Sequence, residues 1–199
     1  MSTGQDKGFF LSVIIPVYNS EHTVRQALES VFASRYSEFE VIVVDDGSKD
    51  ASRSIIKEFS CSVIDLKENG GAAGARNVGA RSAKADVLVF IDSDCVVDTE
   101  ALGRFPAYFK DGSCDAVCGI YGKKRILFDL VSTYKSLFLH FNQDNDNPRF
   151  WSGCAAIKKE VFFDLGGFDE RCKGALVEDT AFGYLLSASG HGMKVARDI

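Results

Sequence analysis

The chain has 199 residues, a length that suits one domain with a substantial buried core. Its composition, 46% hydrophobic and 26% charged, is ordinary for a globular protein. The formal net charge of −5 argues against nucleic acid as the main partner, because no basic excess is available to neutralise phosphates.

The N-terminus and the cysteines favour a cytoplasmic protein. The segment MSTGQDKG lacks the apolar run of a signal peptide, and no part of the sequence reaches the ~20 apolar residues that a membrane-spanning helix needs. None of the six cysteines lies in a CxxC pair, and no histidine lies at zinc-finger spacing. We therefore expect reduced structural thiols.

Short β-branched runs alternate with helical patterns in the first half of the chain. The predicted elements, in order, are a strand at 9–19, a helix capped by Ser20, a strand at 39–46, a helix capped by Ser48, a strand at 61–66, a helix at 72–83 and a strand at 86–92. Continuous apolar strands separated by helices predict a mostly parallel sheet that is covered on both faces, which is a three-layer α/β/α sandwich. In such sheets, ligands bind beyond the carboxyl ends of the strands.

The pattern loosens in the second half. The predicted elements are a helix at 99–110, a strand at 114–122, an amphipathic helix at 126–141, a polar loop at 143–149, a strand or turn with a short helix within 151–170, a helix at 177–190 and a strand that begins at 193. The amphipathic helix is expected to pack on its own domain. A membrane-surface or partner-binding face is the alternative.

Two carboxylates follow the strand at 86–92. Side chains two residues apart in an extended segment point the same way, so Asp92 and Asp94 converge on one point. Two such groups repel each other unless a cation lies between them, and a hard divalent metal that shares its shell with substrate phosphates fits this pattern. The alternative is that Asp92 caps the next helix while Asp94 is solvated.

Other polar groups are predicted to share the same edge of the sheet. Asp45 and Asp46 end the second strand, where a carboxylate accepts from a base or a ribose, or else forms a turn and a helix cap. The Gly-rich segment 68–77 opens a helix and offers backbone N–H groups to a phosphate, although it matches neither GxGxxG nor the P-loop. Glu178 and Asp179 begin a later helix. Either they only stabilise the positive end of the helix dipole, or one of them is a general base at this edge.

Taken together, these segments resemble the family 2 glycosyltransferases, which have the GT-A fold. The matching segments, in the family's order, are SVIIPVYN (12–19), EVIVVDDGSKD (40–50), NGGAAGARNVG (69–79), ADVLVFIDSD (85–94), WSGCAAIKKEVF (151–162), GGFDE (166–170) and the ED pair at 178–179. The resemblance implies a GT-A-type, Rossmann-like fold. It also implies an inverting transfer from a nucleotide-sugar, most often a UDP-sugar, to a hydroxyl of a glycan or lipid-linked acceptor, as in polysaccharide biosynthesis.

The resemblance assigns roles to individual residues on the donor side. Those expected to bind the nucleotide are Pro16, Tyr18, Asn19, Asp46, Arg76, Asp92 and Ser93. Within this set, Asp46 would meet the base and Arg76 would lie near the pyrophosphate. Asp92 and Asp94 match the family's DxD motif, with Asp94 the direct ligand of Mg²⁺ or Mn²⁺ and Asp92 nearer the ribose.

On the acceptor side, Asp179 matches the family's catalytic base, and Glu178 precedes it. The residues expected to shape the donor-sugar or acceptor site are Trp151, Gly153, Phe168, Asp169 and Glu170. Such a base would take the proton of a hydroxyl that attacks the sugar from the face opposite the leaving group. This attack inverts the anomeric centre and needs no covalent intermediate with the enzyme.

We expect a single GT-A domain over 1–199, with a nucleotide-binding half at 1–98 and an acceptor-binding half at 99–199. Related domains usually continue further after the ED pair, so the acceptor half is expected to be truncated. His191 comes too early to be the histidine that often binds the metal there, and we expect a surface position for it. Peripheral association with the inner face of the membrane through 126–141 is a further expectation.

Three other classes of protein compete with this interpretation. A receiver-like signalling domain would carry its acid pair after the first strand, where Asn19 stands. A nucleotidyltransferase would have a Gly-rich basic loop there, and PVYNSEHT is neither Gly-rich nor basic. A catalytically inactive module that binds a nucleotide-sugar remains the main alternative.

Overall fold

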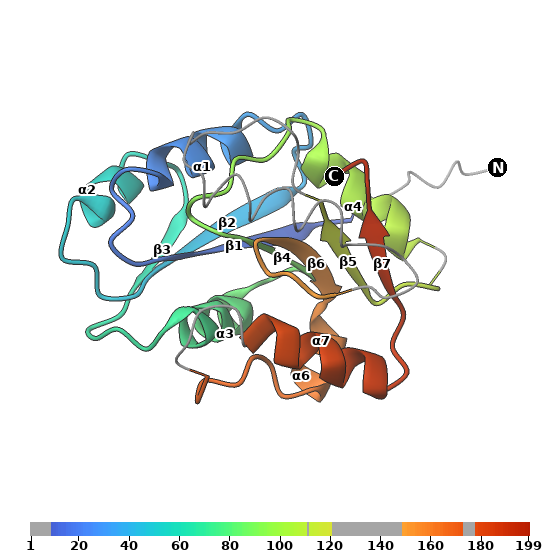
Figure 1. Ribbon diagram of the computed structural model, residues 1–199. Coiled ribbons are helices and arrows are strands. Elements are labelled where there is room, and N and C mark those ends of the chain that lie inside the picture. The colour runs from blue at the N-terminus through green and yellow to red at the C-terminus, as the bar shows by residue number, and fades with distance from the viewer. Residues whose placement is uncertain (1–8, 111, 121–148, 173–177) are drawn as a thin grey trace, which may run out of the picture.

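The computed structural model describes residues 9–110, 112–120, 149–172 and 178–199. One sheet with the strand order β3-β2-β1-β4-β6-β5-β7 forms its centre (Figure 1). The strands are β1 (Leu11–Val17), β2 (Phe39–Asp45), β3 (Ser62–Asp65), β4 (Val87–Ile91), β5 (Ala116–Gly119), β6 (Cys154–Lys158) and β7 (Met193–Ala196). The helices are α1 (Val24–Phe32), α2 (Ser52–Ile56), α3 (Ala72–Ser82), α4 (Ala101–Phe109), α6 (Lys159–Asp164) and α7 (Glu178–Ala188).

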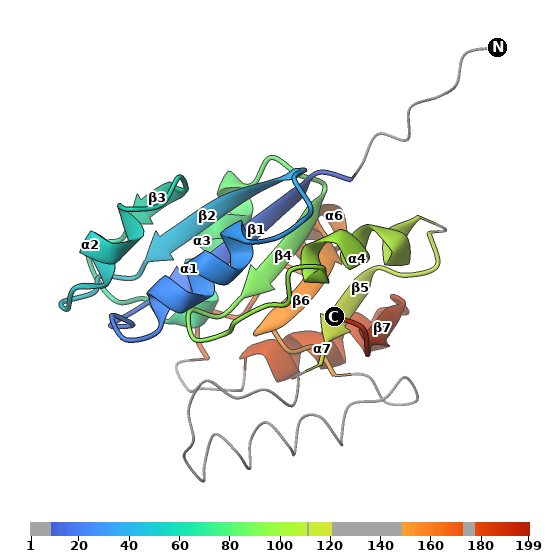
Figure 2. The same ribbon diagram turned by 90° about the horizontal axis from the view of Figure 1, so that it is seen from above.

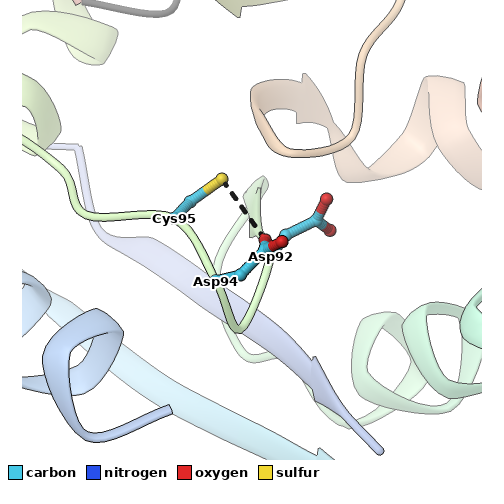
Figure 3. Close-up of side chains that lie close together, drawn as sticks. All are labelled: Asp92, Asp94 and Cys95. Carbon is cyan, nitrogen blue, oxygen red and sulfur yellow. Dashed lines mark hydrogen bonds between the residues drawn. The ribbon is translucent and has the colours of Figure 1, made fainter. Parts of the chain in front are cut away.

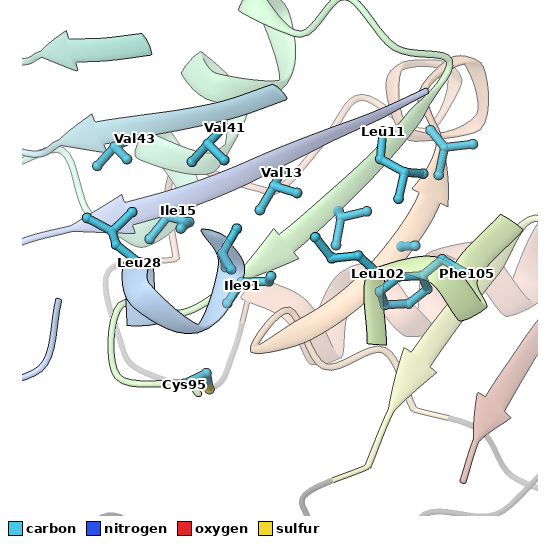
Figure 4. Packing of buried hydrophobic residues seen from close by; sticks show 14 of the residues in the cluster. Leu11, Val13, Ile15, Leu28, Val41, Val43, Ile91, Cys95, Leu102 and Phe105 are labelled. Atoms are coloured by element: carbon cyan, nitrogen blue, oxygen red, sulfur yellow. The ribbon is translucent and has the colours of Figure 1, made fainter. Parts of the chain in front are cut away.

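Helices cover both faces of the sheet. Successive strand residues point to opposite faces, so Val13 and Ile15 of β1 pack against α1 and α4, whereas Ile14 packs against α3. Figure 4 shows the hydrophobic core between the sheet and the helices α1 and α4. Figures 1 and 2 show α1, α2 and α4 on one side of the sheet and α3, α6 and α7 on the other. The predicted three-layer α/β/α sandwich is therefore confirmed.

The sheet is mostly parallel, as predicted. β1 pairs in parallel with β2 and β4, β2 with β3, and β5 with β7. Among the described strands, β6 alone runs antiparallel to its neighbours, β4 and β5. β6 lies between β4 and β5, so the strands before residue 98 and those after it form one continuous sheet. The division of the chain into a nucleotide-binding half and an acceptor-binding half at this residue stays a prediction.

Two predicted helix starts are wrong. α1 begins at Val24 rather than at Ser20, and α2 begins at Ser52 rather than after Ser48. The serine hydroxyls bond to neighbouring loops instead of capping these helices: Ser20 Oγ lies 2.9 Å from Ser93 Oγ, and Ser48 Oγ accepts from the Asn19 N–H at 3.0 Å.

The amphipathic segment 126–141 and most of the polar loop at 143–149 lie outside the described residues, so the two predictions for them stay open. Within the described part of the chain, no helix is both long enough and apolar enough to cross a bilayer.

Helix α3 lies unusually close to the sheet at Gly79. A Cβ atom on this glycine would stand 2.4 Å from Ile14 Cγ2 and 3.3 Å from Val44 Cγ2, so no side chain fits without a shift of the helix. This contact fixes the distance between α3 and the sheet. It therefore also fixes the polar side chains that α3 carries toward the carboxyl edge.

Replacing Gly79 by alanine should lower the free energy of unfolding by about 1–3 kcal/mol, because the added methyl group overpacks the contact with Ile14. Urea denaturation measures this change. Gly103→Ala in α4 is the matched control, since its Cβ would meet nothing closer than Tyr36 Cβ at 3.6 Å. Equal stability of the two variants would contradict the packing argument.

Candidate active site

The strand order reverses beside β1. The chain runs from β1 to β2 on one side, and β4 pairs with β1 on the other side. Ligands of open α/β sheets bind at such a switch point, beyond the carboxyl ends of the strands. Residues 18–23 follow β1, and residues 92–100 follow β4, so both loops lie at this edge.

The DxD carboxylates come together after β4. Single ligand atoms of Asp92, Asp94 and Cys95 all lie within 4.8 Å of one another, and Figure 3 shows the three side chains around the turn. The Cys95 Sγ lies 3.9 Å from Asp94 Oδ1. Asp92 is half-buried and Asp94 is exposed, so the pair is open to a ligand on one side. Two converging carboxylates form a donor set suited to Mg²⁺ or Mn²⁺.

Hydrogen bonds join the loops around this turn. Ser20, which we did not predict as a site residue, lies 2.9 Å from Ser93 through the two hydroxyl oxygens, and its N–H donates to Ser52 Oγ at 2.7 Å. Asn19 adopts φ +48°, the one positive φ among the described non-glycine residues, and its Oδ1 accepts from the Lys49 N–H at 2.8 Å. The loops after β1, β2 and β4 therefore form one bonded rim.

Two predicted nucleotide-binding residues of β1 and its loop differ in exposure. Pro16 is buried within β1, opposite Val44 of β2. Tyr18 is 47% exposed at the switch point. Of these two, Tyr18 is the side chain available for a flat ligand.

Asp46 lies at the end of β2 and is buried. Its two carboxylate oxygens accept from the N–H groups of Gly70 and Gly71 at 2.9 and 2.8 Å. The sequence led us to expect that glycines of this loop offer N–H groups to a phosphate, and in the structure these two N–H groups bond to Asp46. Gly71, at φ +89°, is the N-cap residue that directly precedes α3. Asp46 thus fixes the start of α3.

Arg76 of α3 connects two carboxylates, one after β4 and one in α7. It projects from α3, is 4% exposed, and donates from Nη2 to Asp92 Oδ1 at 2.6 Å and from Nη1 to Glu178 Oε1 at 3.0 Å. Burial opposes its charge, but the carboxylates of Asp92 and Glu178 outweigh this and raise the pKa of Arg76. The following helix, α4, has Glu100 at its N-cap and no side-chain cap hydrogen bond, so Asp92 does not cap it.

Asp179, the predicted base, is 5% exposed in the first turn of α7. Burial is the main cause that raises the pKa of its carboxyl, and the neighbouring Glu178 adds to this rise. Hydrogen bonds from the Thr180 N–H at 2.7 Å and from the Ser152 N–H at 3.5 Å oppose it. A buried carboxyl with a raised pKa beside a ligand site is suited to proton transfer.

The predicted sugar-side residues lie in two segments. Trp151 is half-buried, and its indole Nε1 is buried without a hydrogen-bond partner in the described part of the chain. The carbonyl of Gly153 accepts from the Asp92 N–H at 3.1 Å. Gly153 therefore lies next to the DxD turn, whereas the Trp151 N–H donates to Cys118 Sγ of β5 at 3.4 Å.

The second segment is the loop 166–170. Phe168 is buried, Asp169 pairs with Arg171, and Glu170 is exposed while it accepts from Asn77 Nδ2 at 2.9 Å. Asn77 was missed at the sequence level. The one feature of the sequence that could have indicated it is the presence of a polar residue on the buried side of an Ala-rich helix.

His191 lies away from these carboxylates. Its Nδ1 is 3.1 Å from Asp115 Oδ2, and Asp115 directly precedes β5. Since β5 runs in the same direction as β4, its amino end lies at the opposite edge of the sheet from Asp92. His191 is half-buried there, where we expected a surface position.

Comparison with known families agrees with this geometry. The family model described as "Glycosyl transferase family 2" matches residues 12–166, so the chain belongs to this family of glycosyltransferases. A curated relative, an uncharacterized glycosyltransferase of Haemophilus influenzae, is 46% identical over 172 residues, which cover 79% of this chain and 55% of the relative. The chain spans between 16% and 55% of the length of such relatives.

Solved structures show the same fold. Staphylococcus aureus TarS 1–349 in complex with UDP is 26% identical with a TM-score of 0.74, over 96% of this chain and 58% of that one. Mannosyltransferase PcManGT from Pyrobaculum calidifontis, in complex with GDP-Man and Mn²⁺, is 21% identical with a TM-score of 0.73, over 94% of this chain and 55% of that one. The predicted family and the predicted GT-A fold are therefore confirmed.

Replacing Arg76 by glutamine should lower the free energy of unfolding by about 3–5 kcal/mol, because Glu178 stays buried without its cation. Arg25→Gln is the matched control, since it breaks the exposed pair with Glu58 and should leave no resolvable change. Urea denaturation of both variants at neutral pH gives the comparison. Similar losses would show that the Arg76 bridge does not stabilise the fold.

Proposed function

We propose that this chain catalyses a metal-dependent, inverting transfer of a sugar from a UDP-sugar to a hydroxyl of a glycan or lipid-linked acceptor. The observation that carries the proposal is the Arg76 bridge, which joins the DxD carboxylate Asp92 to the buried pair Glu178 and Asp179. One cation thereby holds the metal side and the base side of the site together. The length of the curated relatives leaves room for acceptor-binding parts beyond this chain.

The residues at the DxD turn fit a divalent cation. Asp94 and Asp92 offer two hard oxygen ligands, with the Cys95 Sγ nearby, and the mannosyltransferase with the same fold contains Mn²⁺. When bound, such an ion acts as a Lewis acid toward the diphosphate, whose negative charge grows as it leaves. Asp92 is held by Arg76 on one oxygen, so its other oxygen and Asp94 would hold the ion.

The exposed ring of Tyr18 and the buried carboxylate of Asp46 lie beyond β1 and β2, which supports a nucleoside position over these two strands. Tyr18 would stack on the base. Asp46 would act near the nucleobase mainly by fixing the Gly70–Gly71 backbone, since both of its oxygens already accept from that loop.

Asp179 would serve as the general base. The acceptor hydroxyl oxygen attacks C1 of the sugar, its proton passes to Asp179, and the bond from C1 to the phosphate oxygen breaks with its electron pair on UDP. Arg76 neutralises Glu178, so that two adjacent buried carboxylates do not both stand uncompensated. Ser152 donates to Asp179 from its backbone and hydroxyl, which orients the carboxylate.

UDP together with Mn²⁺ should raise the melting temperature, because both bind the folded state. At a ligand concentration about 100-fold above Kd, the gain is ~2.7 kcal/mol, or roughly 5–10 °C for a chain of this length. Asp94→Asn should remove the dependence on Mn²⁺, whereas Asp164→Asn, at an exposed carboxylate, should keep it. An unchanged melting temperature at millimolar UDP and Mn²⁺ would refute the proposed donor site.

Asp179→Asn should keep UDP binding and lower kcat by about 10²–10⁴-fold, because it removes the proton acceptor alone. Sugar transfer by a protein that includes the acceptor-binding parts is the assay, with UDP binding measured in parallel and Asp164→Asn as the control. Full turnover by the Asp179 variant would exclude this residue as the base.

The activity should also depend on pH through Asp179. Its pKa is raised by burial, so the ionised, basic form is lost at a higher pH than for an exposed aspartate, whose ordinary pKa is about 3.9. Activity should therefore rise as the pH rises through this shifted value. A pH profile of kcat/KM whose acidic limb lies at or below the ordinary value would contradict the assignment.

A further inference from the structure

Asn77 makes an unusual set of contacts from helix α3. It is 4% exposed, and its side-chain amide bonds to the backbone of Phe168 on both sides: Oδ1 accepts from the Phe168 N–H at 3.0 Å, and Nδ2 donates to the Phe168 carbonyl at 2.8 Å. The side-chain amide of Asn77 thus pairs with both backbone groups of Phe168, as the backbone of a neighbouring strand would do. These two hydrogen bonds attach the loop 166–170 to α3.

The loop is built to receive this amide. Gly166 and Gly167 both have positive φ values, +86° and +72°, so the chain turns sharply before Phe168. A Cβ atom on Gly167 would lie 2.8 Å from Asn77 Oδ1, which leaves no room for a side chain at this position. The close approach of the loop to Asn77 therefore depends on glycine.

Phe168 fixes the other side of the loop. Its ring packs against Phe90 of β4, Phe162 of α6 and Phe182 of α7, with ring centroids 5.1–5.3 Å apart. The guanidinium of Arg76 lies 5.8 Å from the centroid of the same ring. Because Arg76 also binds Asp92, the loop lies beside the side chain that holds the DxD carboxylate.

Glu170 emerges from this fixed loop as an exposed carboxylate. Its Oε1 accepts from Asn77 Nδ2 at 2.9 Å, and its Oε2 lies 3.9 Å from the point where a Cβ on Gly74 would stand. Gly74 belongs to the first turns of α3, which begin at the carboxyl edge of the sheet. Glu170 is therefore held at the same edge as Asp92, and the residue is exposed there.

We propose that Asn77 is a positioning residue that holds Glu170 so that its carboxylate accepts hydrogen bonds from hydroxyl groups of the sugar carried by the nucleotide. An ionised carboxylate is a strong acceptor, and sugar hydroxyls are donors that water competes for, so a fixed direction matters. The Arg76 contact with Phe168 assigns Glu170 to the donor sugar rather than to a distant acceptor. The inference rests on the proposed function and specifies which group recognises the donor.

The test compares the affinities for UDP and for UDP-sugars in the presence of Mn²⁺. Isothermal titration with UDP, UDP-glucose, UDP-galactose and UDP-N-acetylglucosamine gives the sugar increment, defined as the ratio of Kd for UDP to Kd for the tightest UDP-sugar. Glu170→Ala should reduce the sugar increment about tenfold, because it removes a charged hydrogen-bond acceptor. Its Kd for UDP should stay unchanged. Since Glu170 is exposed, this variant is expected to fold.

Asn77→Ala should reduce the sugar increment by a similar factor in the natural chain and by nothing further in the Glu170→Ala background. This lack of additivity distinguishes positioning through Glu170 from a general loss of structure. Glu170→Gln, which keeps an oxygen acceptor, should restore part of the increment. Asp164→Ala, which removes an exposed carboxylate at the end of α6, is the matched control and should leave the increment unchanged.

The outcomes separate the inference from the proposed function. If UDP binds and the UDP-sugars bind with the same increment in the Glu170→Ala protein, the inference alone is overturned. Additive losses in the double variant overturn the role of Asn77. Failure of the unmodified chain to bind UDP at all overturns the proposed function and the inference with it.

Discussion

The buried cation of Arg76 is the interaction on which the geometry of the site depends. Glu178 and Asp179 are buried at the start of α7, and Asp92 is half-buried after β4. Burial disfavours the charged forms of such carboxylates, and the repulsion between them disfavours their close approach. One guanidinium, held by α3, bonds to two of them and lies near the third. A planar fork with several donors can make both bonds at once, which a lysine cannot do.

Helix α3 positions both the DxD turn and the segments that carry Glu178 and Glu170. Its start is fixed by Asp46 through the Gly70 and Gly71 amides, and its contact with the sheet is fixed by Gly79 against Ile14. From this helix Arg76 reaches the DxD turn and α7, while Asn77, the next residue, reaches the loop 166–170. Two adjacent side chains of one helix therefore set the positions of segments 16 to 102 residues away.

The sequence indicated the fold through hydrophobic periodicity. The runs that became β1, β2 and β4 are short, apolar and β-branched, and such runs separated by helical patterns indicate a covered parallel sheet. The starts of α1 and α2 were wrong because serine is equally suited to capping a helix and to bonding a neighbouring loop. Ser20 and Ser48 do the latter, and the choice depends on loops that are distant in sequence.

The sequence by itself determined which strands end in acidic residues, because the strand period is a local property. For Asp92 and Asp94 it predicted an extended segment, whereas the structure has a turn there, in which the Cys95 N–H donates to the Asp92 carbonyl at 3.0 Å. The sequence also determined the family, which the comparisons confirmed. The tertiary structure alone decided that Arg76 is a buried bridge between Asp92 and Glu178, and that Asn77 binds Phe168 and Glu170. Those contacts join residues 16 to 102 positions apart, and only the packing of α3 against the sheet and α7 brings them together.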